Sequence, residues 1–115
     1  MFSEIRRSLR NQWVVLAMTG ELDLGTSPML RQAVVAAVAD GHNNLVIDLS
    51  GVDFIDSAGL GSVIGALRRV RSHDGHLLLV CSEQRALRVF EMCDLDRVFT
   101  FHVDIASAVG PPVQV

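Results

Sequence analysis

Short apolar runs alternate with helical stripes of apolar residues along this chain. Compact runs at residues 45–49 and 76–81 are typical of strands that are buried on both faces. Residues 13–18, rich in β-branched and aromatic side chains, predict another strand. Residues 4–9 alternate weakly and are expected to pair with that strand at an edge, with residues 10–12 as the turn. Residues 98–101 are a shorter candidate strand.

Helical patterns lie between these strands. The first is expected to begin at Thr26 and Ser27, where a hydroxyl can cap it before Pro28, and to stop at Gly41. The second begins at Ser57, and the third covers residues 83–93. A last helical turn follows Val103. The inward positions predicted for these helices are Leu30, Ala33, Val34, Ala37 and Val38, then Leu60, Val63, Ile64, Leu67 and Val70, then Leu87, Val89 and Phe90.

The resulting order, β-β-α-β-α-β-α-β, predicts an α/β fold. Strands that alternate with helices form a largely parallel sheet, and the first hairpin adds an antiparallel edge. At 115 residues the chain is expected to form a single domain over residues 1–115, with a frayed tail at about residues 110–115.

Composition narrows the class of protein. Half of the residues are apolar and a fifth are charged, as in globular domains. A net charge of −3 gives no electrostatic reason to bind nucleic acid, and no apolar run approaches the roughly 20 residues that span a bilayer. Cys81 and Cys93 lack metal-ligand spacing and are expected to be reduced thiols packed as small hydrophobes. These features predict a cytoplasmic protein.

The most informative stretch is DLSGVDFIDSAGLGS, residues 48–62, in which a strand is followed by a short loop and a helix. Ser57 is the expected N-cap, where its hydroxyl would accept from the free amides of the first turn. Gly59 and Gly61 weaken the helix there and would leave its N-terminal end open to another molecule. Asp53 and Asp56 precede the serine and would form an acidic rim.

Asp23 belongs to the same picture, because it ends the second strand in the segment GELD, residues 20–23. If the two strands are parallel neighbours, Asp23 and Ser57 lie at one edge of the sheet. Capping alone would also explain Ser57, and solvated turns would explain Asp23, Asp53 and Asp56 without a magnesium ion. The sequence lacks the nucleophile elbow of hydrolases, its histidines lack metal-ligand spacing, and its Gly-x-Gly lacks a Walker-A lysine. Catalytic residues, a metal and a cofactor are therefore not expected.

Residues 20–23 and the segment VIDLSGVDFIDSAGLG, residues 46–61, resemble the STAS domain family, specifically its stand-alone anti-sigma factor antagonists. The resemblance implies a mixed sheet of four to five strands with helices packed mainly on one face. It places a phosphorylation site on Ser57. Many relatives carry a second hydroxyl residue directly after this site, and Ala58 here leaves Ser57 as the only acceptor within the motif.

The resemblance also implies partners. The unphosphorylated domain would bind a serine kinase that acts as an anti-sigma factor and so free the sigma factor; phosphorylation would end that binding, and a protein phosphatase would restore it. No enzyme activity, direct nucleic-acid binding or membrane binding is implied, and a weak homodimer is compatible. The alternative is a STAS scaffold, or a module that senses a small anion or nucleotide in stress signalling. The expected partner-binding residues are Asp23, Asp56, Ser57, Ala58, Gly59, Leu60 and Gly61.

Overall fold

The computed structural model describes residues 2–110 and contains the predicted alternation of strands and helices. The predicted frayed tail falls almost entirely on residues 111–115, which lie outside the described residues. The elements, in chain order, are β1 (Glu4–Arg10), β2 (Trp13–Leu22), α1 (Ser27–Ala39), β3 (Asn44–Ile55), α2 (Ser57–Arg71), β4 (His76–Val80), α3 (Gln84–Met92), β5 (Thr100–His102) and α4 (Ile105–Val109).

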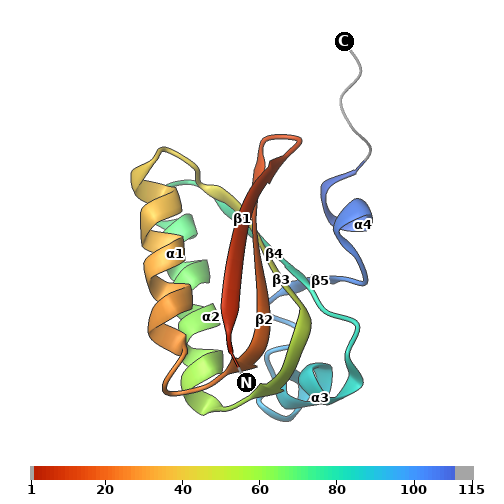
Figure 1. Cartoon of the computed structure of the whole chain (residues 1–115). Helices are drawn as coiled ribbons and strands as arrows, with labels where there is room; N and C mark the ends of the chain where they lie inside the picture. The colour runs from red at the N-terminus through yellow and green to blue at the C-terminus, as the bar shows by residue number, and fades with distance from the viewer. Residues whose placement is uncertain (1, 111–115) are drawn as a thin grey trace.

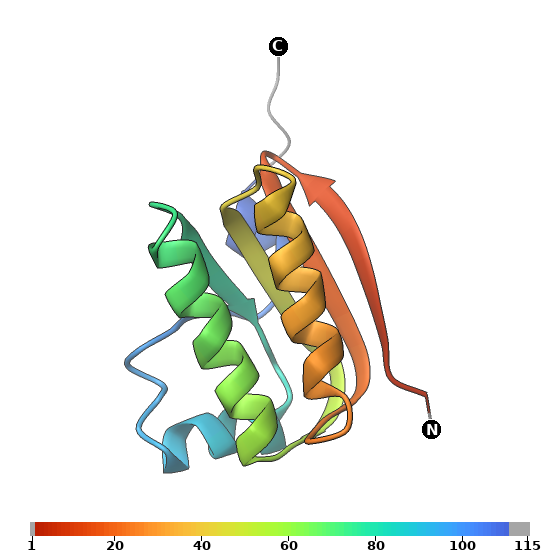
Figure 2. The same cartoon turned by 90° about the vertical axis from the view of Figure 1, so that its left-hand side faces the viewer.

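The five strands form one mixed sheet in the order β1-β2-β3-β4-β5. β1 and β2 are antiparallel, joined by a tight turn in which Asn11 and Gln12 have positive φ angles of 50° and 71°. The remaining neighbours are parallel. Because right-handed crossovers add each new strand on the same side, the connecting helices are placed on one face of the sheet. Figures 1 and 2 show α1 and α2 lying side by side on that face.

The alternation of side chains along the strands creates a large core and a small one. The large core lies between the sheet and helices α1, α2 and α3, and it includes Leu16, Ile47 and Phe90. On the opposite face, Val15, Val46 and Val80 are covered by Trp13 and by side chains of α4. The prediction of helices mainly on one face is therefore confirmed, with α4 as the one short helix on the other (Figure 1).

One strand boundary differs from the prediction in a way that matters for the site. β3 continues to Ile55, six residues beyond the predicted end. β2 ends at Leu22, within the segment of residues 20–23 where it was predicted to end. The polar residues and Gly51 interrupt the apolar pattern of β3, but the partner strand still pairs with it: Thr19 lies opposite Gly51 and Leu22 opposite Ile55, with register shifts between them. Pairing thus overrides local propensity, and the predicted loop before Ser57 is mostly strand. β5 also starts two residues late, at Thr100.

Candidate functional site

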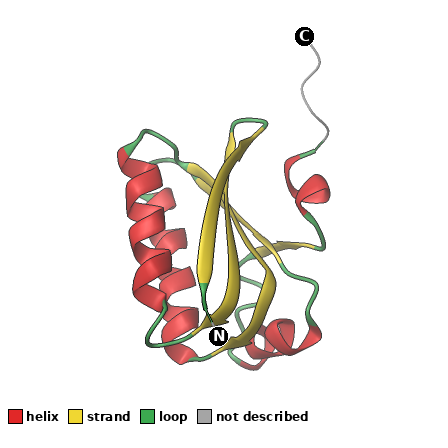
Figure 3. Ribbon diagram, in the orientation of Figure 1, coloured by secondary structure: helices red, strands yellow, loops and turns green. Residues whose placement is uncertain are grey.

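The site lies where the parallel strands β2 and β3 end together. Their last residues, Leu22 and Ile55, are register partners, and the Asp56 amide donates to the Leu22 carbonyl at 3.2 Å. The β2–α1 loop therefore lies against the start of α2, as Figure 3 shows at the lower edge of the sheet. This confirms the expectation that Asp23 and Ser57 follow neighbouring parallel strands and share one edge.

Asp56, not Ser57, is the N-cap of α2, so the capping prediction for Ser57 is wrong. Asp56 has an extended backbone, and its Oδ1 accepts from the Gly59 amide at 2.8 Å. Its Oδ2 accepts from the Leu24 amide at 3.1 Å. One carboxylate thus caps the helix, complements its positive N-terminal dipole and fixes the neighbouring loop.

Ser57 occupies the first helical position and is exposed. In the part of the chain that the structure describes, its hydroxyl makes no hydrogen bond. The amides of Ser57 and Ala58 precede the first intrahelical bond, which runs from the Leu60 amide to the Asp56 carbonyl at 2.9 Å. An accessible hydroxyl therefore lies beside two unsatisfied donors at the positive end of a 15-residue helix.

Asp23 shapes the β2–α1 loop. Its Oδ1 accepts from the amides of Gly25 at 3.1 Å and Thr26 at 3.0 Å, and lies 3.0 Å from the Thr26 hydroxyl. The hydrogen bond from the Thr26 side chain, assisted by these amides, lowers the pKa of the Asp23 carboxyl. Asp23 is thus held ionised at the edge it shares with Ser57.

Thr26 has a different role in the structure from the one predicted from the sequence. Its hydroxyl was expected to cap α1, but it makes no capping hydrogen bond. Instead it accepts from the Asp23 amide at 2.9 Å and lies 2.7 Å from the Glu21 carbonyl. A polar residue three positions after an aspartate, just before Ser-Pro, is the local signal for such a turn. Ser27, the other expected cap, is buried.

Gly59 and Gly61 have different surroundings, although both were expected to leave the helix end open. Gly59 is buried, and an added Cβ would collide with the Leu22 backbone carbonyl. Gly61 is exposed, and an added Cβ would meet nothing within 4 Å. The open-end interpretation is therefore wrong for Gly59, which permits close packing of α2 on β2, and it stays a prediction for Gly61.

The other predicted residues divide between surface and core. Ala58 is half-buried beside Ser57. Leu60 is 5% exposed and belongs to the large core, so its side chain supports the helix rather than the surface. Asp53 is exposed on β3, where it lines a hollow with Arg85 and Val89 of α3. It therefore faces α3 and does not join Asp56 in one rim.

Two exposed apolar side chains in the strand and loop that precede α2 and α1 were not among the predicted residues. Leu24, in the β2–α1 loop, is 76% exposed, and Phe54, near the end of β3, is 52% exposed. Single exposed apolar side chains are common on protein surfaces, and only a large contiguous apolar patch marks an interaction surface by itself. Phe54 lines the same hollow beside α3 as Asp53, whereas its neighbour Ile55 is buried in the large core.

The described part of the chain offers no metal centre and no membrane span. Over residues 2–110, no three His, Cys, Asp or Glu side chains gather as metal ligands. Within the same range, no helix has the length and apolar content to cross a bilayer.

The two cysteines have opposite surroundings. Cys81 is buried, and burial raises the pKa of its thiol. Cys93 is exposed at the end of α3, so the expectation of a packed thiol is wrong there. Its position one residue beyond the last helical turn places it on the solvent side.

Comparison with known proteins agrees with this geometry. The STAS domain family model matches residues 4–108. The anti-sigma-B factor antagonist of Staphylococcus aureus (strain NCTC 8325 / PS 47) is 29% identical over 91 residues, which cover 79% of this chain and 84% of that protein. The protein of the same name from Staphylococcus epidermidis is 32% identical over 66% of this chain and 70% of its own length.

A solved structure is similar over almost the whole chain. The crystal structure of an anti-sigma factor antagonist from Mycobacterium paratuberculosis has a TM-score of 0.85 at 29% identity, and the match covers 94% of this chain and 92% of that one. The family match, the fold and the strand–loop–helix motif at Ser57 agree. The chain therefore belongs to the STAS domain family.

Proposed function

We propose that this protein is an anti-sigma factor antagonist, a single-domain cytoplasmic binding protein without catalytic activity. In its unphosphorylated form it binds an anti-sigma factor that is also a serine kinase, and this binding releases the sigma factor. The kinase phosphorylates Ser57 and ends the interaction; a phosphatase restores it. The observation that carries the proposal is the exposed Ser57 hydroxyl at the start of α2, which makes no hydrogen bond within residues 2–110, in a chain similar to proteins of that name.

The fold can accept a phosphate at Ser57. Phosphorylation adds about −1.5 to −2 charges at neutral pH. The unsatisfied amides of Ser57 and Ala58 and the helix dipole favour negative charge at this position. Because Asp56 already supplies the cap through its own side chain, modification of Ser57 removes no hydrogen bond that holds the helix. The phosphorylated domain should therefore stay folded.

A partner surface fitted to the neutral hydroxyl would not accept that phosphate. Neither residues 21–30 nor residues 56–67 contain a lysine or arginine, so the β2–α1 loop and the first turns of α2 supply no basic side chain to neutralise it. Asp23 and Asp56 add negative charge nearby. Burying an uncompensated charge in an interface costs several kcal/mol, and about 1.4 kcal/mol is a tenfold change in affinity.

The contact surface that we propose centres on Ser57 and its neighbours. Asp23, Asp56, Ala58 and Gly61 form its polar and small-residue part, and the exposed Leu24 provides an apolar anchor beside them. Leu24 is tied to Asp56 through the 3.1 Å hydrogen bond of its amide. The loop therefore presents an apolar side chain beside the modified residue. A phosphate on Ser57 would lie close to this contact with the partner.

Phosphorylation by the cognate kinase tests this function directly. Wild-type protein incubated with the kinase and ATP should gain one phosphate, and Ser57→Ala should gain none. Ser62 is a built-in control, because it is buried and its hydroxyl donates to the Gly59 carbonyl at 2.6 Å. Phosphate that persists on Ser50 or Ser62 in the Ser57→Ala variant would refute the assignment.

A further inference from the structure

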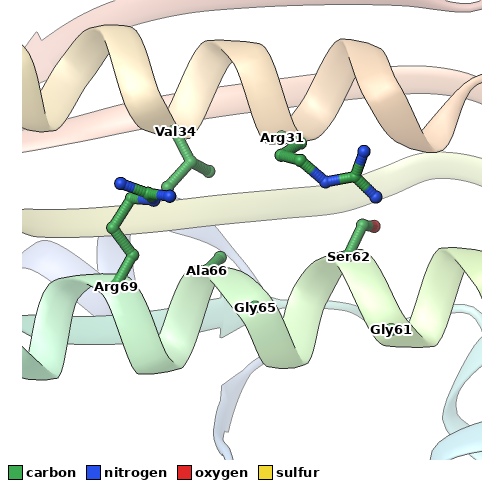
Figure 4. A pocket seen from close by; sticks show the side chains of 7 residues that line it. All are labelled: Arg31, Val34, Gly61, Ser62, Gly65, Ala66 and Arg69. Atoms are coloured by element: carbon green, nitrogen blue, oxygen red, sulfur yellow. The ribbon is translucent and has the colours of Figure 1, made fainter.

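A groove runs between α1 and α2 on the outer surface of the helical layer. We call it the α1–α2 groove. Its volume is about 150 Å³. Figure 4 shows the Arg31 side chain reaching over Ser62, and the Arg69 side chain reaching across from α2 toward Val34. The residues that line it are Arg31 and Val34 on α1, and Gly61, Ser62, Gly65, Ala66 and Arg69 on α2.

The two glycines of this groove are not required by the fold. Gly61 and Gly65 are exposed, and a Cβ at either would meet nothing within 4 Å. Neither has a positive φ angle. Glycine inside a helix lowers helix stability relative to alanine. Neither packing nor backbone conformation accounts for them, and the absence of side chains at both positions keeps the floor of the groove low.

The charge of the groove is positive and unbalanced. α1 and α2 contain Arg31, Arg68, Arg69 and Arg71 and no aspartate or glutamate. Asp40, directly after α1, is paired with Arg7 at 2.8 Å. Within residues 2–110, neither Arg31 nor Arg69 forms an ion pair. The helical layer is thus a basic surface on a chain whose net charge is −3.

The size and shape of the groove favour a protein segment over a small molecule. Pockets for small molecules typically enclose about 300–1,000 Å³ and bury most of the ligand. The α1–α2 groove is smaller and partly open to solvent. It also continues the proposed contact surface, since Ser57, Gly61, Gly65 and Arg69 follow one another at four-residue steps and therefore form one continuous ridge along α2.

We infer that the α1–α2 groove docks an acidic segment of the anti-sigma factor. Carboxylates of that segment pair with Arg31 and Arg69, and its backbone approaches α2 over Gly61 and Gly65. The inference rests on the proposed function and adds a second contact to it. The Ser57 end switches binding on and off, and the groove supplies charge-dependent affinity and selects partners with a matching acidic segment.

Charge reversal in the groove tests this inference. In its unphosphorylated form, the double variant Arg31→Glu/Arg69→Glu should bind the cognate anti-sigma factor at least tenfold more weakly than wild type, as measured by calorimetry. Its affinity should also depend less on the salt concentration. The matched control is Arg10→Glu/Arg97→Glu, which makes the same charge change at two exposed arginines outside the groove; its affinity should stay within about threefold of wild type. Gly65→Leu should weaken binding in the same way without lowering the melting temperature.

Two results would overturn the inference. One is wild-type affinity and salt dependence in both Arg31→Glu/Arg69→Glu and Gly65→Leu. The other is a specific, saturable set of amide shifts at Arg31 and Arg69 on titration with inorganic phosphate or ADP, which would identify a small-anion site. Failure of the proposed function can be distinguished from failure of this inference by a separate measurement. If the proposed function is wrong, the Ser57→Glu variant will bind the anti-sigma factor as tightly as wild type.

Discussion

At the scale of single residues, the start of α2 depends on the Asp56 carboxylate. Both of its oxygens accept backbone amides, those of Gly59 and Leu24, whereas the Ser57 hydroxyl accepts none in the described chain. Asp56→Ala should therefore lower the free energy of unfolding by about 1–2 kcal/mol, the usual effect of losing an N-cap. Ser57→Ala should change it by less than about 0.5 kcal/mol. Urea denaturation of both variants measures this, and equal losses would contradict the assignment of the cap.

Asp23 makes the stability of the β2–α1 loop depend on pH. Its pKa is lowered in the folded protein, chiefly by the Thr26 side chain. A carboxyl with a lowered folded-state pKa stabilises the fold above its unfolded value, near 4, and this contribution disappears as the pH falls through the folded value. The difference in unfolding free energy between wild type and Asp23→Asn should therefore shrink on acidification below about pH 4.

Comparing wild type with Asp23→Asn isolates the pH-dependent contribution of Asp23 from the contributions of other acidic residues. Asp104 also has a lowered pKa, caused first by the Ser107 amide, but it is present in both proteins and cancels in the difference. A difference that stays constant from neutral pH to about pH 2 would show that the ionised Asp23 does not stabilise the loop.

At the scale of elements, the packing of α2 on β2 depends on the absence of a side chain at Gly59. Gly59→Ala would place a methyl group against the Leu22 carbonyl, and forced overpacking typically costs about 1–3 kcal/mol. Gly61→Ala is the matched control two residues later. Its Cβ meets open space, so the helix propensity of alanine should leave stability unchanged or raise it by up to about 1 kcal/mol. Thermal melts that rank the two variants equally would contradict this packing.

The helices were more predictable than the strands and the caps. Leu30, Val34 and Ala37 follow helical spacing and are buried as expected, and Gly41, with φ 93°, follows the end of α1. The second half of β3 was missed, because pairing with β2 rather than apolar content makes residues 50–55 a strand. The sequence pattern predicted the start of α2 correctly but predicted Ser57 rather than Asp56 as its cap. The identity of a cap depends on the backbone angles of single residues, which the pattern does not specify.

At the scale of the whole molecule, the arrangement of charge and apolar surface required the three-dimensional structure. The parallel order of β2 and β3 was enough to predict that Asp23 and Ser57 share one edge. Arg31 and Arg69 are 38 positions apart, and only the packing of α1 beside α2 brings them to one groove. In the same way, the exposure of Leu24 and Phe54 follows from loop and strand geometry rather than from composition.

The central claim is that a charge at Ser57 removes partner binding without unfolding the domain. The most direct measurement is the affinity of the cognate anti-sigma factor for unphosphorylated, phosphorylated and Ser57→Glu protein, with circular dichroism and melting temperature recorded on each sample. We predict an intact fold in all three samples and at least a hundredfold loss of affinity on phosphorylation, or about 2.7 kcal/mol. The Ser57→Glu variant should lose part of that affinity, because one carboxylate carries less charge than a phosphate. Equal affinity of the phosphorylated and unphosphorylated proteins, or loss of binding only together with loss of fold, would contradict the account.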